Sequence, residues 1–288
     1  MDWFPLALLS AVAIATADAL TKRHFSHEDP WDAASARFVW SGVLLLPWAL
    51  SAGPPPADPR FWTWVLALIP LDLLAVFIYV RAITTAPLSH TLPYLSFSPV
   101  FSLVVGYVLL GETVSVAGAS GVVLITAGAY WLNGAEMGRG GWFAPFRFML
   151  SEPGPRLMLG VALIFSVTAV LGKGAVQYMP GADFGALYAV LFGASAAIVV
   201  LARGRSPLRI ARARPLAVFG VAAAMAIMVV SHFVAIEQVT SGYMIAVKRT
   251  SMLFGLVYGA LWFREIELGR NLAATALMLV GVALVLVR

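Results

Sequence analysis

The stretch "RAITTAPLSHTLPYLSFSPVFSLVVGYVLLGE" (81–112) occurs a second time, in altered form, as "VAIEQVTSGYMIAVKRTSMLFGLVYGALWFRE" (234–265). The two copies align without a gap at an offset of 153 residues, and Ser98, Gly106 and Glu112 each meet the same residue type in the later copy. Membrane helices share a composition, so isolated identities mean little. A gapless run that closes on glutamate in both copies indicates that the chain consists of two related halves.

The composition places the whole chain in a membrane. Of its 288 residues 61% are hydrophobic and 11% are charged, and the mean hydropathy is +0.89. A soluble domain carries about a quarter charged residues, and about 20 consecutive apolar residues are enough to cross a bilayer. The absence of cysteine excludes disulfides and thiolate chemistry. The sequence therefore predicts a polytopic α-helical membrane protein.

Ten candidate spans follow from the apolar runs and the turn residues between them. They cover 3–23, 33–51, 61–82, 88–110, 114–133, 157–178, 183–202, 215–237, 241–263 and 268–287. We expect a first five-helix repeat over 1–133, a connecting loop over 134–156 and a second repeat over 157–288. An odd number of spans per repeat gives the halves opposite orientations. Inverted repeats are a transporter architecture, with the site near the bilayer midplane.

Basic residues set the expected orientation. Twelve Lys and Arg flank the spans on the side of the first loop, and two lie on the other side. Because cytoplasmic loops carry the excess of basic residues, we expect both termini to face away from the cytoplasm. The first span lacks a basic start, so we interpret it as a retained span of a multi-pass protein of the inner (plasma) membrane.

The repeated region resembles a known family. "SPVFS" (98–102), Gly106 and Gly111-Glu112, with a second copy that closes in "WFRE" (262–265), resemble the EamA-type branch of the drug/metabolite transporter superfamily. The resemblance implies that spans 1–4 and 6–9 surround a central cavity, with spans 5 and 10 outside. It also implies alternating-access transport of small metabolites such as amino acids. The second copy departs from the first at Lys248-Arg249, where the first copy has Leu95-Ser96.

Lys248, Arg249 and Asp72 are charged residues deep inside predicted spans, where charge is costly and marks a cavity or an ion pair. Lys248 lies about seven residues, or roughly 10 Å, into span nine, and Asp72 lies at a similar depth in span three. We expect Asp72 to lie within reach of Lys248 or Arg249. Two interpretations stay open: the basic pair is a structural ion pair, or it lines the cavity and binds a negatively charged group of the solute. Asp72 is either the ion-pair partner or a proton or cation site.

Other side chains are candidates for the same site, each with a plain packing role as the alternative. His232 falls at a depth similar to Lys248, and Tyr79 takes its place in the first half. Asp18 is expected to pair with Lys22 one turn away, or else to bind a cation. Tyr94, Ser96 and Tyr243 are the remaining candidates, by stacking or hydrogen bonding.

Proline and glutamate positions in spans four and nine have expected structural roles. Pro93 and Pro99 are expected to kink span four, where Ser96 and Ser98 can satisfy the freed carbonyls. Glu112 and Glu265 are expected to act at helix ends and in packing.

The function that these observations favour is secondary transport of a small polar or amphipathic metabolite, an amino acid or organic anion. The alternative is transport of a cationic or drug-like solute, with Lys248 and Arg249 purely structural. No motif of a metalloprotease, a P-loop or a dinucleotide fold is present, which argues against an enzyme. We expect no cofactor, no metal and no nucleic acid. The expected partners are a small-molecule substrate, the lipid bilayer and a proton as coupling ion, for a monomer or weak dimer.

Overall fold

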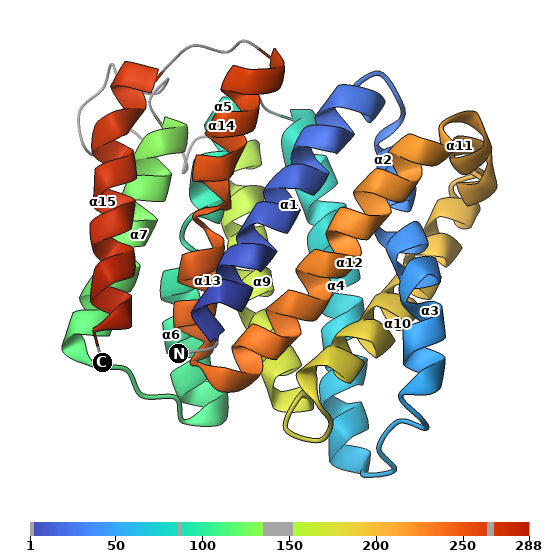
Figure 1. The fold of residues 1–288 in the computed structure, drawn as a ribbon, viewed down its shortest axis with the longest axis horizontal. Helices are drawn as coiled ribbons and strands as arrows, with labels where there is room; N and C mark the ends of the chain where they lie inside the picture. Colours follow the sequence, from blue (N-terminus) through green and yellow to red (C-terminus); the bar gives the residue numbers. More distant parts are fainter. Residues whose placement is uncertain (1–2, 86–87, 135–151, 264–267, 288) are drawn as a thin grey trace. The chain divides into compact units, whose positions relative to one another are not determined.

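The computed structural model describes residues 3–85, 88–134, 152–263 and 268–287, and every regular element in these ranges is a helix (Figure 1). Within these ranges eight helices are long and apolar enough to cross a membrane: Trp3–Phe25, Pro30–Ser51, Pro59–Ala82, Thr91–Leu110, Pro153–Ala175, Gly181–Ala202, Pro215–Gln238 and Ser241–Trp262. Two shorter apolar helices, Val116–Trp131 and Leu272–Leu286, take the places of the fifth and tenth predicted spans. The all-α class and the order of the ten segments are confirmed.

The chain forms two compact units. Unit 1 holds Met1–Ile69, Gly172–Val239 and Ser251–Ile266, and unit 2 holds Pro70–Leu171, Thr240–Thr250 and Glu267–Arg288. Each unit therefore takes segments from both halves of the sequence, and the unit boundaries fall inside α4 (Pro59–Thr85) and α9 (Pro153–Ala175). The division of the sequence into repeats over 1–133 and 157–288 remains a prediction.

Unit 1 is built around helices that share close backbone contacts. In it α1 (Trp3–Phe25) packs on α12 (Pro215–Gln238) and on α14 (Ser251–Phe263), while α10 (Gly181–Ala202) packs on α3 (Trp40–Ser51) and α12. A Cβ atom added to Gly42 of α3 would lie 2.6 Å from the carbonyl oxygen of Ala189 in α10. Glycine is thus needed at this point for α3 and α10 to approach.

A charged network joins two connections of unit 1. Asp32 in α2 (Pro30–Ala34) has a fully buried side chain, and it accepts hydrogen bonds from Arg209 and, at 3.2 Å, from Arg205. Arg205 also pairs with Asp29 at 2.6 Å. Arg209 belongs to the short helix α11 (Pro207–Ala213). Arg205 and Arg209 belong to the basic residues that predict the membrane orientation. Their ion pairs also hold the connection between α10 and α12 against the start of the second span.

Unit 2 contains α5 (Leu88–Leu95), α6 (Ser98–Leu110), α7 (Val116–Gly134), α13 (Ser241–Lys248) and α15 (Leu268–Leu286). The helices α15 and α7 run side by side (Figure 1). A Cβ atom on Gly121 or on Gly281 would lie 2.6 or 2.7 Å from the carbonyl oxygen of the other glycine. Small residues let membrane helices pack closely, so this pair is held by backbone proximity. Helix α13 packs on α6 and α7.

Spans four and nine are both interrupted, and at the same place in the repeat. Helix α5 ends at Leu95 and α6 begins at Ser98, while α13 ends at Lys248 and α14 begins at Ser251. Adding 153 to either bound in the first copy gives the corresponding bound in the second. The structure therefore shows the repeat in its secondary structure as well as in its sequence.

The backbone at both interruptions tightens rather than unwinds. The amides of Ser96 and Phe97 donate to carbonyls three residues earlier, at 3.1 and 3.3 Å, and the amide of Thr250 does the same at 3.0 Å. Three-residue hydrogen bonds in the middle of a helix often mark a hinge. Pro93 and Pro99 flank the first interruption, as expected. The second interruption forms without proline.

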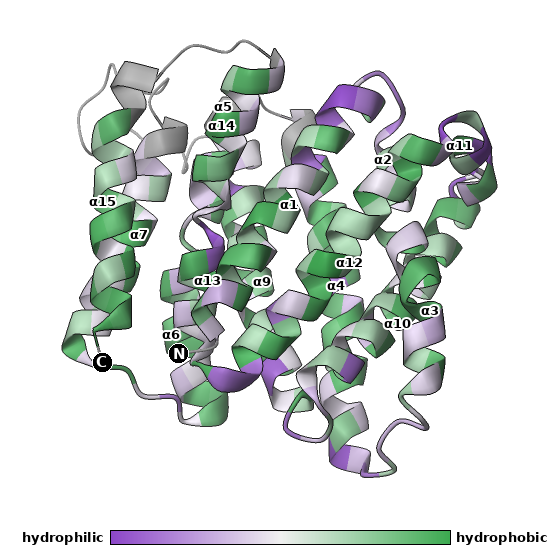
Figure 2. Cartoon of the chain, viewed as in Figure 1, coloured by the Kyte–Doolittle hydropathy of each residue, from purple (hydrophilic) through white to green (hydrophobic). Residues whose placement is uncertain are grey.

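The hydropathy of the helices agrees with a membrane location. Figure 2 shows hydrophobic residues along most of each long helix and hydrophilic residues concentrated in α11 and the connections beside α2. This distribution is what a bilayer requires of a multi-pass chain, because charged side chains are costly at its centre.

Candidate functional site

The two interruptions meet in unit 2 at the side chain of Arg249. The guanidinium of Arg249, at the second interruption, donates to the hydroxyl of Ser98, at the first. Its Nε lies 3.0 Å and its Nη2 2.5 Å from Ser98 Oγ. One edge of the guanidinium is thus directed at one oxygen atom of the opposite span.

Ser98 is itself fixed by the first helix of the second half. Its side chain is buried, and its carbonyl oxygen lies 2.9 Å from the hydroxyl oxygen of Ser166 in α9. The Ser166 hydroxyl also lies 2.7 Å from the carbonyl oxygen of Ala162, so its hydrogen is shared between the two carbonyls. Arg249, Ser98 and Ser166 therefore link three segments in one polar chain inside unit 2.

Aromatic side chains close one side of the first interruption. Tyr94 is 1% exposed and packs edge-on against Tyr130, at 6.2 Å between ring centroids. Phe97 lies 5.5 Å from the same Tyr130 ring. Tyr94 belongs to a hydrophobic cluster with Ala82, Met158 and Val161, and Tyr79 packs against that cluster. Both predicted tyrosines thus have packing roles in unit 2.

Ser96 lies at the first interruption, and its hydroxyl is buried without a hydrogen-bond partner among the residues that the structure describes. A buried hydroxyl without a partner is unfavourable and is available to a solute or a water molecule. Ser96 therefore remains a candidate ligand beside the Arg249–Ser98 contact.

Other predicted residues of unit 2 have separate positions. Lys248 is the last residue of α13 and is half-buried, and Asp72 in α4 is buried. Their predicted pairing remains a prediction. Tyr243 is also buried, and its ring packs on Gly118 of α7, where an added Cβ atom would lie 2.8 Å from Tyr243 Cε1. Tyr243 is therefore placed on the side of α13 that faces α7.

His232 and Asp18 belong to unit 1. His232 is buried in α12 and packs edge-on against Phe233 at 5.0 Å. Asp18 pairs with Arg37, whose Nη1 lies 2.5 Å from Asp18 Oδ1, and its expected pairing with Lys22 remains a prediction. Lys22 is one turn away on the same helix, whereas Arg37 approaches from the next span. Sequence spacing along one helix could not show that partner.

The motif glutamate Glu112 has the helix-end role that the sequence predicts. Its two carboxylate oxygens accept from the amide of Ser241 at 3.1 and 3.0 Å, and the Ser241 hydroxyl donates to one of them at 2.5 Å. Ser241 is the first residue of α13, and the N-cap residue Thr240 makes no side-chain cap of its own. Glu112 therefore caps α13 from a neighbouring span. Its counterpart Glu265 lies outside the described residues.

A family model supplies the classification of the chain. The model of the EamA-like transporter family matches residues 2–134 and 153–287, so the two matches together cover nearly the whole sequence. The chain belongs to the EamA-like transporter family. It is thereby a member of the drug/metabolite transporter superfamily, with two EamA repeats.

Proteins of known structure share the fold of this EamA chain. Matches are found to 22 chains of known structure. One crystal structure aligns with a TM-score of 0.76 and 16% identity, over 98% of this chain and 96% of its own. At that identity the likeness shows the fold alone. A search of curated proteins found no match.

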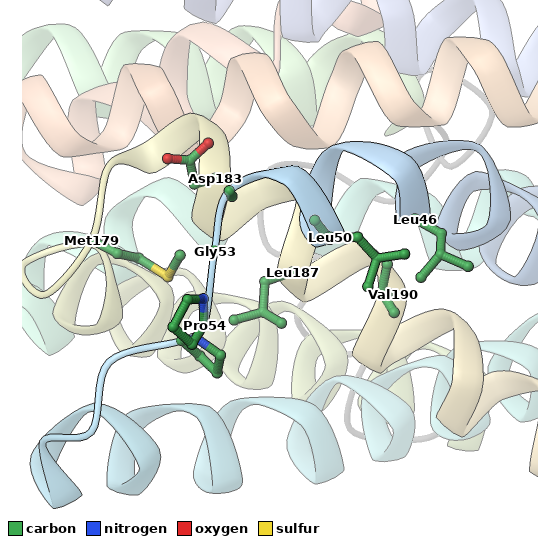
Figure 3. A pocket seen from close by; sticks show the side chains of 11 residues that line it. Leu46, Leu50, Gly53, Pro54, Met179, Asp183, Leu187 and Val190 are labelled. Atoms are coloured by element: carbon green, nitrogen blue, oxygen red, sulfur yellow. The ribbon is translucent and has the colours of Figure 1, made fainter.

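The EamA chain also has a pocket in unit 1 that contains none of the predicted site residues. It has a volume of about 450 Å³ and is lined mostly by apolar side chains of α3, α10 and the connections beside them (Figure 3). Asp183 at its edge accepts a hydrogen bond from Trp48 at 3.0 Å. The pocket therefore combines the hydrogen-bonded Asp183 carboxylate with an apolar surface.

Two features of this EamA chain escaped the sequence analysis. One is the interruption of span nine, for which the available signal was the repeat itself, since the Pro-rich first copy aligns with it. The other is Arg37, a charged residue inside the second predicted span. Its signal was the same as that of Lys248: a basic residue within an apolar run.

Proposed function

We propose that this protein is a secondary transporter that moves a small metabolite with a negatively charged group by alternating access. Arg249 holds that group at the paired interruptions of spans four and nine. Discontinuous helices at corresponding positions of inverted repeats are where transporters of this architecture bind solute. The observation that carries the proposal is the Arg249–Ser98 contact between the two interruptions.

The geometry of Arg249 suits an anion. The Nε and Nη2 groups that point to Ser98 Oγ form the guanidinium edge that binds a carboxylate with two parallel hydrogen bonds. Ser98 Oγ therefore stands where a carboxylate oxygen of a solute would bind. Lys248, the preceding residue, adds a second positive charge to the same end of α13. The buried Ser96 hydroxyl offers a further hydrogen bond.

The Arg249–Ser98 contact also favours a second candidate function. A guanidinium that joins two spans can serve packing alone. In that case Lys248 and Arg249 are structural, and the solute is cationic or drug-like, recognised by Asp72. The two functions differ in which charge the transport depends on, and that difference can be tested directly.

The test is flux into proteoliposomes that contain the purified chain, with panels of anionic, zwitterionic and cationic metabolites. Loss of a charged hydrogen bond is worth about 1.5–3 kcal/mol, so Arg249→Ala should lower transport of the anionic solute roughly tenfold to a hundredfold. Arg249→Lys should retain part of it, because the charge remains. Arg212→Ala, at an exposed position in α11, is the matched control and should transport normally.

Three results would contradict the anion proposal. If Arg249→Lys and Lys248→Arg both transport normally and neutralising both leaves anion flux unchanged in folded protein, the basic pair is structural. If Asp72→Asn abolishes flux of a cationic solute, the second candidate function is correct. Chemical conversion of the solute during flux would point to an enzyme.

We further propose that the protein resides in the inner (plasma) membrane as a multi-pass protein and uses a proton as its coupling ion. Eight long apolar helices among the described residues support the multi-pass part. Solute accumulation driven by an imposed pH gradient, and its collapse with a protonophore, would test the coupling.

A further inference from the structure

The ion pair of Arg37 and Asp18 in unit 1 lies within membrane spans. Arg37 Nη1 lies 2.5 Å from Asp18 Oδ1. Asp18 is seven residues before the end of α1 at Phe25, and Arg37 is seven residues after the start of its span at Pro30. At 1.5 Å per residue each lies roughly 10 Å along its helix from the nearer end.

The ion pair is only partly covered by the rest of the structure. The side chain of Asp18 is 58% exposed in the structure and that of Arg37 is 20% exposed. A charged side chain at this depth is tolerated beside a water-filled cavity or a partner, and not in hydrocarbon. Asp18 has a partner on one side and accessible surface on the other. The ion pair is therefore not fully enclosed by other side chains.

The local backbone supports a functional role for Arg37. It lies in the π-helix η1 (Ser35–Val39), between α2 and α3 in the second span. Single π-helical turns inside membrane or soluble helices occur frequently at functional sites. The wider turn directs Arg37 toward α1 and α12, where its Nη2 lies 3.7 Å from Met225 Sδ.

The charged and polar side chains near Asp18 in unit 1 belong to the second span, α12, α14 and α1 itself. Helices α2, α12 and α14 pack on α1. The second span presents Arg37, while Asp32 at its start is engaged by Arg205 and Arg209. Helix α12 presents Met225, with His232 and Glu237 farther along it, and α14 presents Tyr258, which contacts Thr16 at 2.7 Å. Lys22 follows one turn later on α1 itself.

We propose that Arg37 is an anion-binding side chain that Asp18 occupies in the empty protein, and that a proton on Asp18 releases it. The step converts the Asp18 carboxylate and a free organic anion, with one proton, into an Asp18 carboxylic acid and an anion paired with Arg37. The net charge of the site does not change, because the charge of the bound proton cancels that of the bound anion. The anion and the proton therefore enter this site together.

Thermodynamic linkage fixes the sign of the coupling between proton binding at Asp18 and anion binding at Arg37. If proton binding at Asp18 strengthens anion binding at Arg37, then anion binding must strengthen proton binding by the same factor. An anion added at constant pH should therefore take protons out of solution. The inference goes beyond the contact proposed at Arg249, because it concerns other residues in unit 1 and predicts a proton signal rather than a flux.

Benzoate is a suitable probe, since it carries one carboxylate and an apolar ring. The half-buried Phe38 offers apolar surface to that ring, and its centroid lies 5.9 Å from the Arg37 guanidinium carbon. The purified chain is titrated with sodium benzoate in weakly buffered detergent solution, and proton uptake is followed with a pH indicator dye. We expect uptake of up to about one proton per bound benzoate, as a single carboxylate allows.

The variants make the result specific. Asp18→Asn should abolish the proton uptake and make benzoate affinity independent of pH, since the competing carboxylate is gone. Arg37→Gln should lose both binding at this site and uptake. Arg23→Gln, which removes a cation at the end of α1 beside Trp262, should keep the uptake. Absence of uptake in the unmodified chain, or undiminished uptake in folded Asp18→Asn, would overturn the proposal. Loss of flux in Arg249→Ala with intact proton uptake would separate this site from the one in unit 2.

Discussion

Removal of the Glu112 carboxylate is the sharpest test of how the repeat positions α13. Glu112 accepts from both the amide and the hydroxyl of Ser241, and the side chain of the N-cap residue Thr240 makes no cap hydrogen bond. A hydrogen bond to a charged group contributes about 1.5–3 kcal/mol, and a negative charge at a helix N-terminus about 0.3–1 kcal/mol more. With allowance for water that enters the vacated site, Glu112→Ala should lower the free energy of unfolding by about 3 kcal/mol.

A graded pair of variants separates the charge from the hydrogen bonds. Glu112→Gln keeps one acceptor oxygen and should lose about 1 kcal/mol. At about 2–4 °C per kcal/mol, the Ala variant should unfold roughly 6–12 °C earlier and the Gln variant roughly 2–4 °C earlier. The assay is thermal unfolding in detergent followed by tryptophan fluorescence, with the exposed Glu152→Gln as the control. An Ala variant that unfolds with the control, or a Gln variant as unstable as the Ala variant, would refute the capping argument.

Four further predictions follow from particular contacts and charges. Gly42→Ala should cost about 1–3 kcal/mol, because its Cβ would meet a backbone carbonyl of α10, whereas Gly160→Ala, with open space around it, should be neutral or slightly stabilising in the same unfolding assay. Asp32→Asn should cost about 1–3 kcal/mol, since it leaves two partly exposed guanidiniums without their shared carboxylate, and an unfolding temperature that does not change would contradict this. Asp72→Asn should destabilise the protein more than Glu152→Gln if its carboxylate neutralises a buried cation, and equal unfolding temperatures would remove that role. A C-terminal reporter that is active only in the cytoplasm should be silent, as the twelve-to-two distribution of basic residues predicts, and an active reporter would reverse the topology.

Most of the fold could be predicted because the repeat is written into the sequence. The 153-residue offset that aligns Ser98 with Ser251 also aligns the helix bounds on both sides of the interruptions. The interruption of span four could be predicted from Pro93 and Pro99, because proline cannot donate a helical backbone hydrogen bond. The interruption of span nine had no proline signal, because no proline flanks Lys248-Arg249, and its signal was the alignment with the first copy.

The candidate site was less predictable, because its contacts join residues far apart in the chain. Arg249 was a candidate from its charge, but its contact with Ser98 spans 151 residues and has no sequence signature. Asp18 shows the same limitation, since spacing along the helix indicated only Lys22, whereas the pair with Arg37 joins two spans. Tyr94 and Tyr243 were selected as aromatic surface, and both are buried in the structure, which the sequence pattern could not show. Pattern identifies charged candidates, whereas only the packed helices decide their partners.

The mixing of both halves in each compact unit has a consequence for synthesis. Unit 1 begins with residues 1–69 and is complete only when residue 266 has been made, an interval of 266 − 69 = 197 residues. At about 5–20 residues per second the first spans wait roughly 10–40 s for their partners. Unit 2 needs the last helix, α15. During that interval lipid must cover the small-residue faces of α1 and α3 that α12 and α10 later bury. The ribosome thus delivers nearly the entire chain as separate inserted helices before either unit can close.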